Sequence, residues 1–427
     1  MSSTPTTPTD HPAPSELAPD PVDVFPRTEP RPIPDARTWL WRTIFAASVS
    51  LVAWSVLGEG WTLTGDGEQY LTMAAGERGA APFGYRTLTP ALAGLLRTDP
   101  VLAFRLVNWT ALVTAAVALT GWARARAPRR ERAAARPVAA VVLGLFLVSF
   151  AVVYYGTILV AVDPPALALL ALALWLLAKE GSPWVIGGLL AFAVLAHETA
   201  LVLVPLLVLD RVLAARALSS RPLDWPGVAA VTACGIGAYV AARASVPVVE
   251  TAEQISYLTT PTAIVAHVLE RSGGLVTHAQ RAYAAWGPAL VYALIGGVVL
   301  ARGRARLFVP AVVGVAVTLS LLATDTLRVM AVIFPVVLLA AAQLVVHAAR
   351  THGRTLAAGL IGAQIGYAAL VFAHLRSFEG SRTLQLAAIA LSAVACGLAL
   401  LAVRSSDAAR VVRLRRSEAE VRAGVVA

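Results

Sequence analysis

The chain alternates long apolar segments with short arginine-containing ones from Thr38 to Arg404. A transmembrane helix needs roughly 20 mostly apolar residues. The pattern therefore predicts an all-α fold, a polytopic transmembrane helical bundle of about 12 spans. The predicted spans lie at 39–58, 101–121, 137–157, 164–178, 183–196, 199–213, 226–246, 284–301, 307–323, 327–346, 355–373 and 383–403. The pair within 183–213 is short, so one long tilted helix is the alternative there.

The arginine-rich segment RARAPRRERAAAR (124–136) predicts the orientation, because cytoplasmic loops carry excess Lys and Arg. Counting outward from it places the N- and C-termini in the cytoplasm. A single span at 183–213 would move RGRAR (302–306) to the outside, so two short helices are favoured. The opposite face then receives the outer loops 59–100 and 247–283. The loop 247–283 is longer than a simple connection and is expected to hold short helices over an outer cavity.

Composition supports a membrane protein, with 58% hydrophobic and 14% charged residues and a mean hydropathy of +0.71. A soluble domain is nearer half apolar and a quarter charged. The net charge of +10 comes from arginines that punctuate apolar segments, so no nucleic-acid partner is expected. Cys234 and Cys396 lie in apolar runs without CxxC spacing, which excludes a zinc site. The use of arginine in place of lysine is typical of a GC-rich bacterial genome. Together with the many apolar segments, this predicts a multi-pass protein of the bacterial plasma (inner) membrane.

Three parts of the chain are expected. Residues 1–37 are rich in Pro, Ser, Thr and Asp and are predicted to be a disordered cytoplasmic tail, without the apolar core of a signal peptide. Residues 38–403 form the transmembrane domain. Residues 404–427 form a basic cytoplasmic tail.

Two motifs of the first outer loop carry candidate chemistry. GDGEQYLTMA (65–74) places Asp66 and Glu68 at the start of a helix that can lie amphipathically on the membrane surface. A carboxylate there can act as a general base or ligate a divalent cation, and the simpler alternative is a solvated turn with Asp66 as a helix cap. PFGYRTLTPALAGLL (82–96) places Tyr85 and Arg86 before an apolar helix too short to span, where arginine either holds a phosphate or snorkels to head groups.

Two further motifs lie at span ends of the same face. Asp163, in VAVDPPALALL, precedes two prolines and therefore suits a helix cap. It is a candidate site residue only because it is expected to lie at the same depth in the membrane as Asp66. His197 and Glu198 stand alone in an apolar stretch, AVLAHETALVLVP, where ionisable residues are costly and usually face a cavity or a partner. Leu201 stands where an HExxH motif needs its second histidine, so metalloprotease chemistry is excluded.

Asp325 and Arg328, in LLATDTLRVMAVIFPVVLL (321–339), are three residues apart and share a helical face. Either they pair near the head groups, or Arg328 reaches a lipid phosphate while Asp325 orients it. In the second case Arg86 and Arg328 would give two guanidinium groups for one anionic donor.

Together, the GDGEQYLTMA, PFGYRTLTP, HET and DTLRVMAVIFP motifs resemble those of bacterial members of the multi-spanning GT-C glycosyltransferase superfamily, over roughly 39–346. The resemblance implies transfer of a sugar from a polyprenyl-phosphate donor, among membrane lipids, to a glycan or lipid acceptor on the outer side. It implies that Asp66 is the catalytic base or a metal-associated carboxylate. Gly67 separates Asp66 from Glu68, whereas many members pair these acids, and Asp163 stands alone, so the need for a divalent cation stays open.

The mechanism expected from this resemblance is an inverting displacement. Asp66 takes the proton of the acceptor hydroxyl, Arg86 and Arg328 neutralise the leaving phosphate, and His197 with Glu198 shapes the donor side. A transporter or lipid flippase would place charges at several depths and on both faces, whereas these gather on one. A non-catalytic membrane scaffold would explain the hydrophobicity but not the charges beside span ends.

Overall fold

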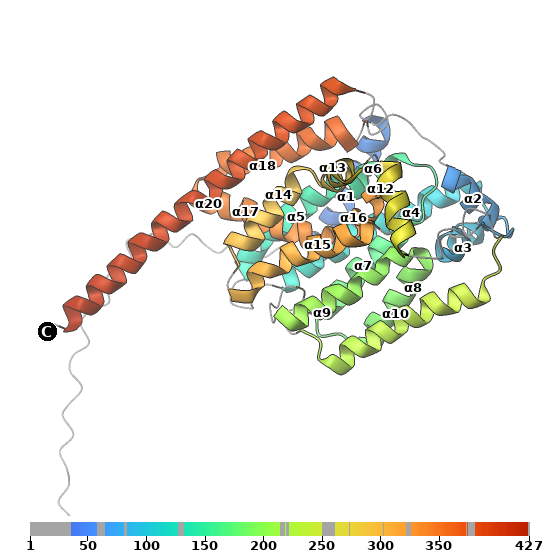
Figure 1. The fold of residues 1–427 in the computed structure, drawn as a ribbon, viewed down its shortest axis with the longest axis horizontal. Coiled ribbons are helices and arrows are strands. Elements are labelled where there is room, and N and C mark those ends of the chain that lie inside the picture. The colour runs from blue at the N-terminus through green and yellow to red at the C-terminus, as the bar shows by residue number, and fades with distance from the viewer. Residues whose placement is uncertain are drawn as a thin grey trace, which may run out of the picture.

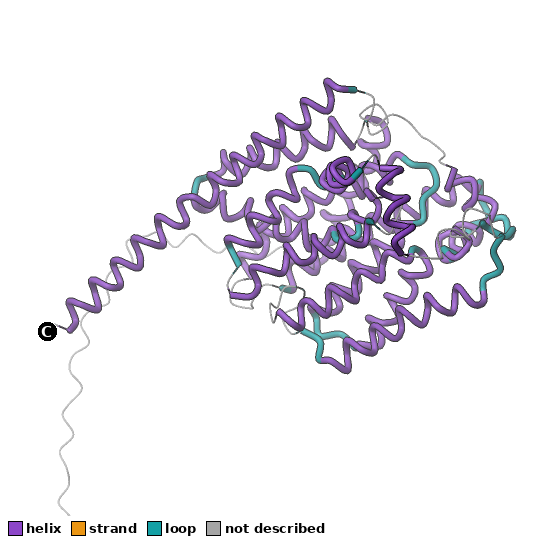
Figure 2. The backbone as a smooth tube through the Cα atoms, in the orientation of Figure 1, coloured by secondary structure: helices purple, strands orange, loops and turns teal. Residues whose placement is uncertain are grey.

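The structure is a computed structural model that describes residues 36–57, 65–80, 83–126, 132–213, 218, 222–249, 261–272, 274–301, 303–321, 326–372, 374 and 381–425. Helix is the regular secondary structure throughout this part of the chain (Figure 2). Ala80 and Val249 form an isolated bridge outside any strand. The all-α bundle expected from the hydropathy pattern is confirmed.

The first half of the bundle consists of α1 (Ala36–Leu57), α2 (Gly65–Ala74), η1 (Phe83–Tyr85), α3 (Leu88–Leu95), α4 (Pro100–Ala125), α5 (Arg132–Leu147), α6 (Phe150–Thr157), α7 (Asp163–Ala178), α8 (Pro183–Ala196), η3 (Glu198–Val202), α9 (Leu203–Leu213) and α10 (Trp225–Ser245). The second half consists of α12 (Pro261–Ser272), α13 (Leu275–Ala284), α14 (Pro288–Val299), η4 (Gly303–Leu307), α15 (Phe308–Ser320), α16 (Thr326–Ala331), α17 (Phe334–Thr351), α18 (Arg354–Tyr367), η5 (Ala368–Phe372) and α20 (Arg382–Val425).

Within the described ranges, eight helical stretches are long and apolar enough to cross a membrane, and the bent pair α13 and α14 makes a possible ninth. These stretches are α1, α4, α5 with α6, α10, η4 with α15, α17, α18 with η5, and α20. The chain is therefore a multi-pass membrane protein. The remaining predicted spans correspond to α7, α8 and α9, which have 16, 14 and 11 residues. At 1.5 Å per residue they reach only about 24 Å or less, so twelve crossings and cytoplasmic termini stay predictions.

The centre of the bundle is formed by α4, α7 and α17 (Figure 1). Helix α7 packs between α4 and α8, α10 covers α8, and α17 packs against α14 and α5. Helices α1, α10 and α20 are less buried and carry exposed apolar side chains such as Phe45, Val240 and Ile389. In a membrane protein these outward apolar faces suit contact with lipid.

Two predicted spans are interrupted in the structure. The segment 137–157 breaks between α5 and α6 at Ser149, whose hydroxyl donates to the Phe146 carbonyl oxygen at 2.7 Å. The segment 327–346 divides into α16 and α17, and Pro335 lies in the first turn of α17, a position that proline favours. Arg328 consequently lies on a separate short helix instead of at the start of the span.

The segments expected outside the spans are largely helical. Helices α2 and α3 lie at the opposite end of the molecule from the C-terminal end of α20 (Figure 1). The loop 247–283 contains α12 and α13, as predicted. Helix α20 continues through Val425, so the segment after Arg404 is helical where the sequence suggested only a tail. Residues 1–35, which hold most of the predicted N-terminal tail, lie outside the described residues.

Candidate functional site

Six ionisable residues from distant parts of the chain meet where several helices begin or end. They are Asp66 near the start of α2, Arg86 after η1, Asp163 at the first residue of α7, His197 and Glu198 at the junction of α8 and η3, and Arg328 in α16. As many as 262 positions separate paired residues along the chain. Helix packing, and not sequence proximity, therefore assembles the cluster.

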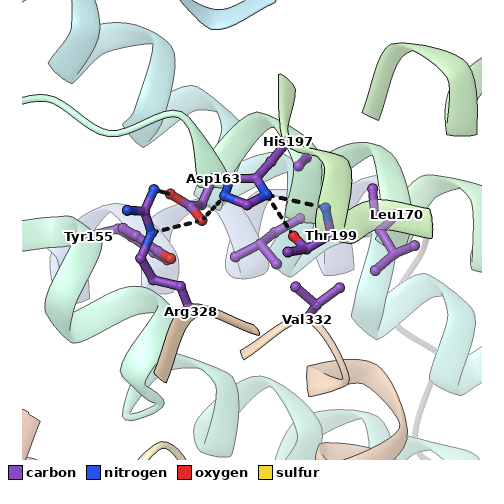
Figure 3. Close-up of a pocket in the computed structure, with 10 residues that line it drawn as sticks. Tyr155, Asp163, Leu170, His197, Thr199, Arg328 and Val332 are labelled. Atoms are coloured by element: carbon purple, nitrogen blue, oxygen red, sulfur yellow. Dashed lines mark hydrogen bonds and ion pairs between the residues drawn. The ribbon is translucent and has the colours of Figure 1, made fainter. Parts of the chain in front are cut away.

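Arg328 and Asp163 form the most buried ion pair of the cluster (Figure 3). The Arg328 Nε donates to Asp163 Oδ1 at 3.2 Å, and Nη2 donates to Oδ2 at 2.6 Å. Asp163 was expected to cap α7, but Val162 holds the capping position and no side chain caps the helix. Pro164 and Pro165 have no backbone N–H, so the first turn of α7 has fewer donors for a capping side chain to accept from. The Asp163 carboxylate is therefore available to Arg328.

The same guanidinium also binds Asp66. Arg328 Nη1 donates to Asp66 Oδ2 at 2.9 Å. The Asp66 side chain is 36% exposed, whereas that of Asp163 is 5% exposed. Arg328 therefore joins the helix α2 to the start of α7 through one deeply buried and one accessible carboxylate.

His197 supports Asp163 from the other side (Figure 3). Its Nδ1 accepts the Thr199 backbone N–H at 3.2 Å and lies 2.8 Å from Thr199 Oγ1, so the ring caps η3. Its Nε2 lies 3.5 Å from Asp163 Oδ1. Burial, reinforced by the nearby Arg86, lowers the pKa of His197 to about 4. The imidazole is thus neutral at pH 7, and because Nδ1 is the acceptor, the proton lies on Nε2 toward Asp163.

Arg86 forms a second buried pair, with Glu198. Its Nε and Nη2 donate to the two carboxylate oxygens at 3.0 and 2.7 Å. Its Nη1 donates to the Tyr70 hydroxyl at 2.7 Å, and the guanidinium stacks 5.5 Å from the centre of the Phe83 ring. Burial would raise the pKa of the Glu198 carboxyl, but His197, which is charged at the low pH where this carboxyl titrates, and the Arg86 guanidinium hold that pKa well below its usual range. Arg86 points inward, so it does not snorkel, and it fastens α2 to the turn before η3.

A cavity of about 160 Å³ adjoins the cluster. Its polar lining includes Asp66, Tyr70, Asp163 and Arg328. The rest of its lining is apolar or aromatic and consists of Tyr154, Tyr155, Ile158, Val160 and Ala161. A smaller space of about 10 Å³, the size of one water molecule, lies between Asp163, His197, Thr199 and Arg328. The site thus offers an accessible carboxylate and a fixed positive charge beside an apolar surface.

The other predicted site residues lie apart from these two cavities. Glu68 is exposed on α2 and lines neither of them. Tyr85 also lines neither; its ring lies 4.1 Å from the Arg243 guanidinium of α10. Arg86 and Glu198 lie behind the cavity wall that Tyr70 forms. Asp325 lies outside the described residues, so its pairing with Arg328 stays a prediction.

Four contributors were not singled out from the sequence. They are Tyr70, Tyr154, Tyr155 and Thr199. Tyr70 follows Asp66 by four positions, which places both on one helical face and is a usable signal. The Tyr154-Tyr155 pair near the end of an apolar segment is a second signal, since a tyrosine there has a ring for the apolar region and a hydroxyl for a polar one.

A divalent cation finds no suitable set of ligands in the part of the chain that the structure describes. No three His, Cys, Asp or Glu side chains there stand together in a way that could hold a metal ion. Asp66 and Asp163 both bind Arg328 instead.

No family model, curated protein or solved structure matches this chain. Function is accordingly inferred from the chemistry of the site. An accessible carboxylate can take a proton, and the adjacent guanidinium can stabilise a developing negative charge. That combination suits displacement of an anionic leaving group by a hydroxyl.

Proposed function

We propose that this protein is a membrane glycosyltransferase of the GT-C type. It moves a sugar from a polyprenyl-phosphate-linked donor to a glycan or lipid acceptor on the extracytoplasmic face of a bacterial plasma membrane. The observation that carries the proposal is the cavity that Asp66 and Arg328 line together with apolar and aromatic side chains. A lipid-linked phosphosugar has the matching parts, namely an apolar chain, an anionic phosphate and a polar ring.

The proposed reaction is a single inverting displacement. Asp66 accepts the proton of the acceptor hydroxyl, and the hydroxyl oxygen attacks the anomeric carbon of the donor sugar. The bond between that carbon and the phosphate oxygen breaks, and the electron pair leaves with the polyprenyl phosphate. Arg328 stabilises the negative charge that grows on this phosphate. Asp163 holds the guanidinium in place through two hydrogen bonds, and His197 contacts Asp163 in turn.

Arg86 has a different role from the one that the motifs suggested. Its guanidinium donates to Glu198 and Tyr70 and lines neither described cavity. Only Arg328 of the two arginines borders the larger cavity. We therefore assign the leaving phosphate to Arg328 alone, and we assign Arg86 to the positioning of α2, which carries Asp66.

The test uses the purified full chain in lipid vesicles with a panel of radiolabelled polyprenyl-phosphate sugars. Release of sugar and formation of free polyprenyl phosphate are measured together. Asp66→Asn is expected to lower transfer at least about 100-fold, the usual contribution of a general base. Glu77→Gln, which removes an exposed charge just beyond α2, is the matched control and should retain transfer.

Three outcomes would contradict the proposal. The first is that the wild-type chain transfers no sugar from any donor of the panel. The second is that Asp66→Asn, shown to be folded by its melting temperature, keeps full activity. The third is movement of labelled carrier across the vesicle without sugar transfer, which would favour a lipid flippase.

A further inference from the structure

The two edges of the Arg328 guanidinium are held very differently. One edge, Nε and Nη2, makes two parallel hydrogen bonds to Asp163, the arrangement that fixes a guanidinium most firmly. The other nitrogen, Nη1, donates to the accessible Asp66 carboxylate at 2.9 Å. The guanidinium therefore has a fixed edge and an exchangeable one.

Burial points to the same asymmetry. The Asp163 side chain is 5% exposed and begins a helix packed in the centre of the bundle. The Asp66 side chain is 36% exposed and belongs to α2, a helix of 10 residues. An exposed ion pair contributes little, whereas breaking a buried pair is costly. Asp66 is thus the partner that an incoming anion can replace.

Both groups that compete for Nη1 border the same cavity. Asp66 and Arg328 line it together, and Tyr154 and Tyr155 also belong to its lining. A phosphate placed against the Arg328 nitrogen from this cavity would meet the Asp66 carboxylate already bound there. Two anions at one nitrogen repel each other, so binding of the phosphate requires the carboxylate to move away.

We propose, building on the proposed function, that Nη1 of Arg328 is a subsite for the phosphate of a lipid and that Asp66 is its built-in competitor. The phosphate takes the place of the Asp66 carboxylate on Arg328. Displacement releases the carboxylate into the cavity, where it can accept a proton from the acceptor hydroxyl. The donor therefore binds before the acceptor, and the base becomes available only when a donor is present. After the polyprenyl phosphate departs and Asp66 releases its proton to water, the carboxylate binds Arg328 again.

The test measures binding, not turnover. The full chain is placed in phosphatidylcholine nanodiscs, and its affinity for a short-chain polyprenyl monophosphate is determined by tryptophan fluorescence. Asp66→Asn removes the competitor and should tighten binding about 2- to 5-fold, a range set by the strength of a partly exposed ion pair. Arg328→Gln should weaken it at least 10-fold. Glu77→Gln removes the same charge from a nearby exposed position and should leave the affinity unchanged.

A parallel titration with phosphatidic acid distinguishes the source of the phosphate. Tighter binding of the polyprenyl phosphate by Asp66→Asn supports a site for the lipid carrier. Tighter binding of phosphatidic acid alone assigns the subsite to an ordinary lipid head group and overturns the donor-first order. Equal or weaker binding of polyprenyl phosphate by Asp66→Asn overturns the competitor role. Equal tightening by Glu77→Gln would attribute the gain to general charge and would also overturn it.

This experiment can fail independently of the proposed function. Sugar transfer by the wild-type chain without tighter binding in Asp66→Asn would leave the glycosyltransferase in place and remove the competition. Tighter binding without transfer from any donor would leave a lipid-phosphate site and remove the enzyme.

Discussion

At the scale of single residues, His197 lies between two ion pairs and is itself neutral. Asp163 and Glu198 favour the charged imidazolium, but burial and the Arg86 guanidinium outweigh them because each carboxylate is already bound by an arginine. Protonation of Nδ1 would also break the hydrogen bond from the Thr199 backbone N–H. A neutral imidazole therefore maintains both the η3 cap and the support of Asp163.

The first prediction follows from this neutral state. The pKa of His197 is lowered from 6.5 to about 4 in the folded chain. Between these values only the unfolded chain takes up the proton, so stability falls as the pH falls from 6.5 to 4 and is unaffected above 6.5. The loss reaches about 3 kcal/mol at the lower limit.

The measurement is the melting temperature of the detergent-solubilised protein between pH 7.5 and 4, compared with that of His197→Gln. The variant lacks the titrating ring and should show a smaller decrease across this window. A parallel decrease in both proteins would assign the effect to other groups and would contradict a neutral, buried His197.

Sequence reasoning identified individual site residues better than their partners. Costly charges at span ends marked Asp163, His197 and Arg328 as candidates, and the structure brings them together. For Arg328 the sequence offered a partner on its own segment, Asp325, which lies outside the described residues, and it did not indicate Asp66 and Asp163, which reach Arg328 from α2 and α7. Such pairing depends on how helices pack, which no local spacing contains.

At the scale of elements, the bend between α13 and α14 fixes the neighbourhood of α16. The two helices meet at 86°, and Gly287 between them has φ +55. Trp286 Nε1 donates to the Met330 carbonyl oxygen at 3.0 Å, two residues after Arg328. From α13, His278 contacts the Thr326 hydroxyl at 3.3 Å at the start of α16. The bend therefore holds the short helix that carries Arg328 from both of its ends.

The second prediction concerns Gly287. A Cβ atom there would lie 2.4 Å from the Tyr367 ring, and the positive φ is itself unfavourable for a side chain. Gly287→Ala should lower stability by about 2–4 kcal/mol, from backbone strain together with the overlap. Gly274→Ala is the matched control, since Gly274 has φ +100 but open space around its Cβ position, and about 1 kcal/mol is expected for strain alone.

Melting temperatures of the two variants provide the comparison. Equal decreases would show that the backbone conformation accounts for the whole effect and that the Tyr367 ring moves aside freely. In that case the bend would be less rigid than its packing indicates.

The hydropathy pattern predicted the helices themselves but not their interruptions. Apolar residues continue through Ser149 and through Val332 and Ile333, so the pattern contains no signal of the breaks there. Pro335 was the one local indication, because proline favours the first turn of a helix. The separate helix α16, and with it the inward direction of Arg328, required the packing of α13 and α15 around it.

At the scale of the whole molecule, the number of crossings depends on α7, α8 and α9. Composition alone predicted a multi-pass protein, because apolar segments of spanning length dominate the chain. It could not decide whether helices of 16, 14 and 11 residues also cross. The central position of α7, packed between α4 and α8, is compatible with a short span lined by protein and not by lipid.

The last prediction tests this by the parity of the crossings between two exposed threonines, Thr72 of α2 and Thr351 at the end of α17. An odd number of predicted spans separates these two residues, which places them on opposite sides of the membrane. If none of the three short helices crosses, the number is even and both residues lie on the same side. Single cysteines at 72 and 351, in a chain with Cys234 and Cys396 replaced by alanine, should label from opposite sides with a membrane-impermeant maleimide. A third cysteine at exposed Ser182, between α7 and α8, should label from the side opposite to 72 if α7 crosses. Labelling of 72 and 351 from the same side would mean that one or all three of the short helices do not cross, which leaves eleven or nine of the twelve predicted crossings. It would also place the C-terminal tail on the side of Asp66, so that the positive-inside assignment of the later loops would fail.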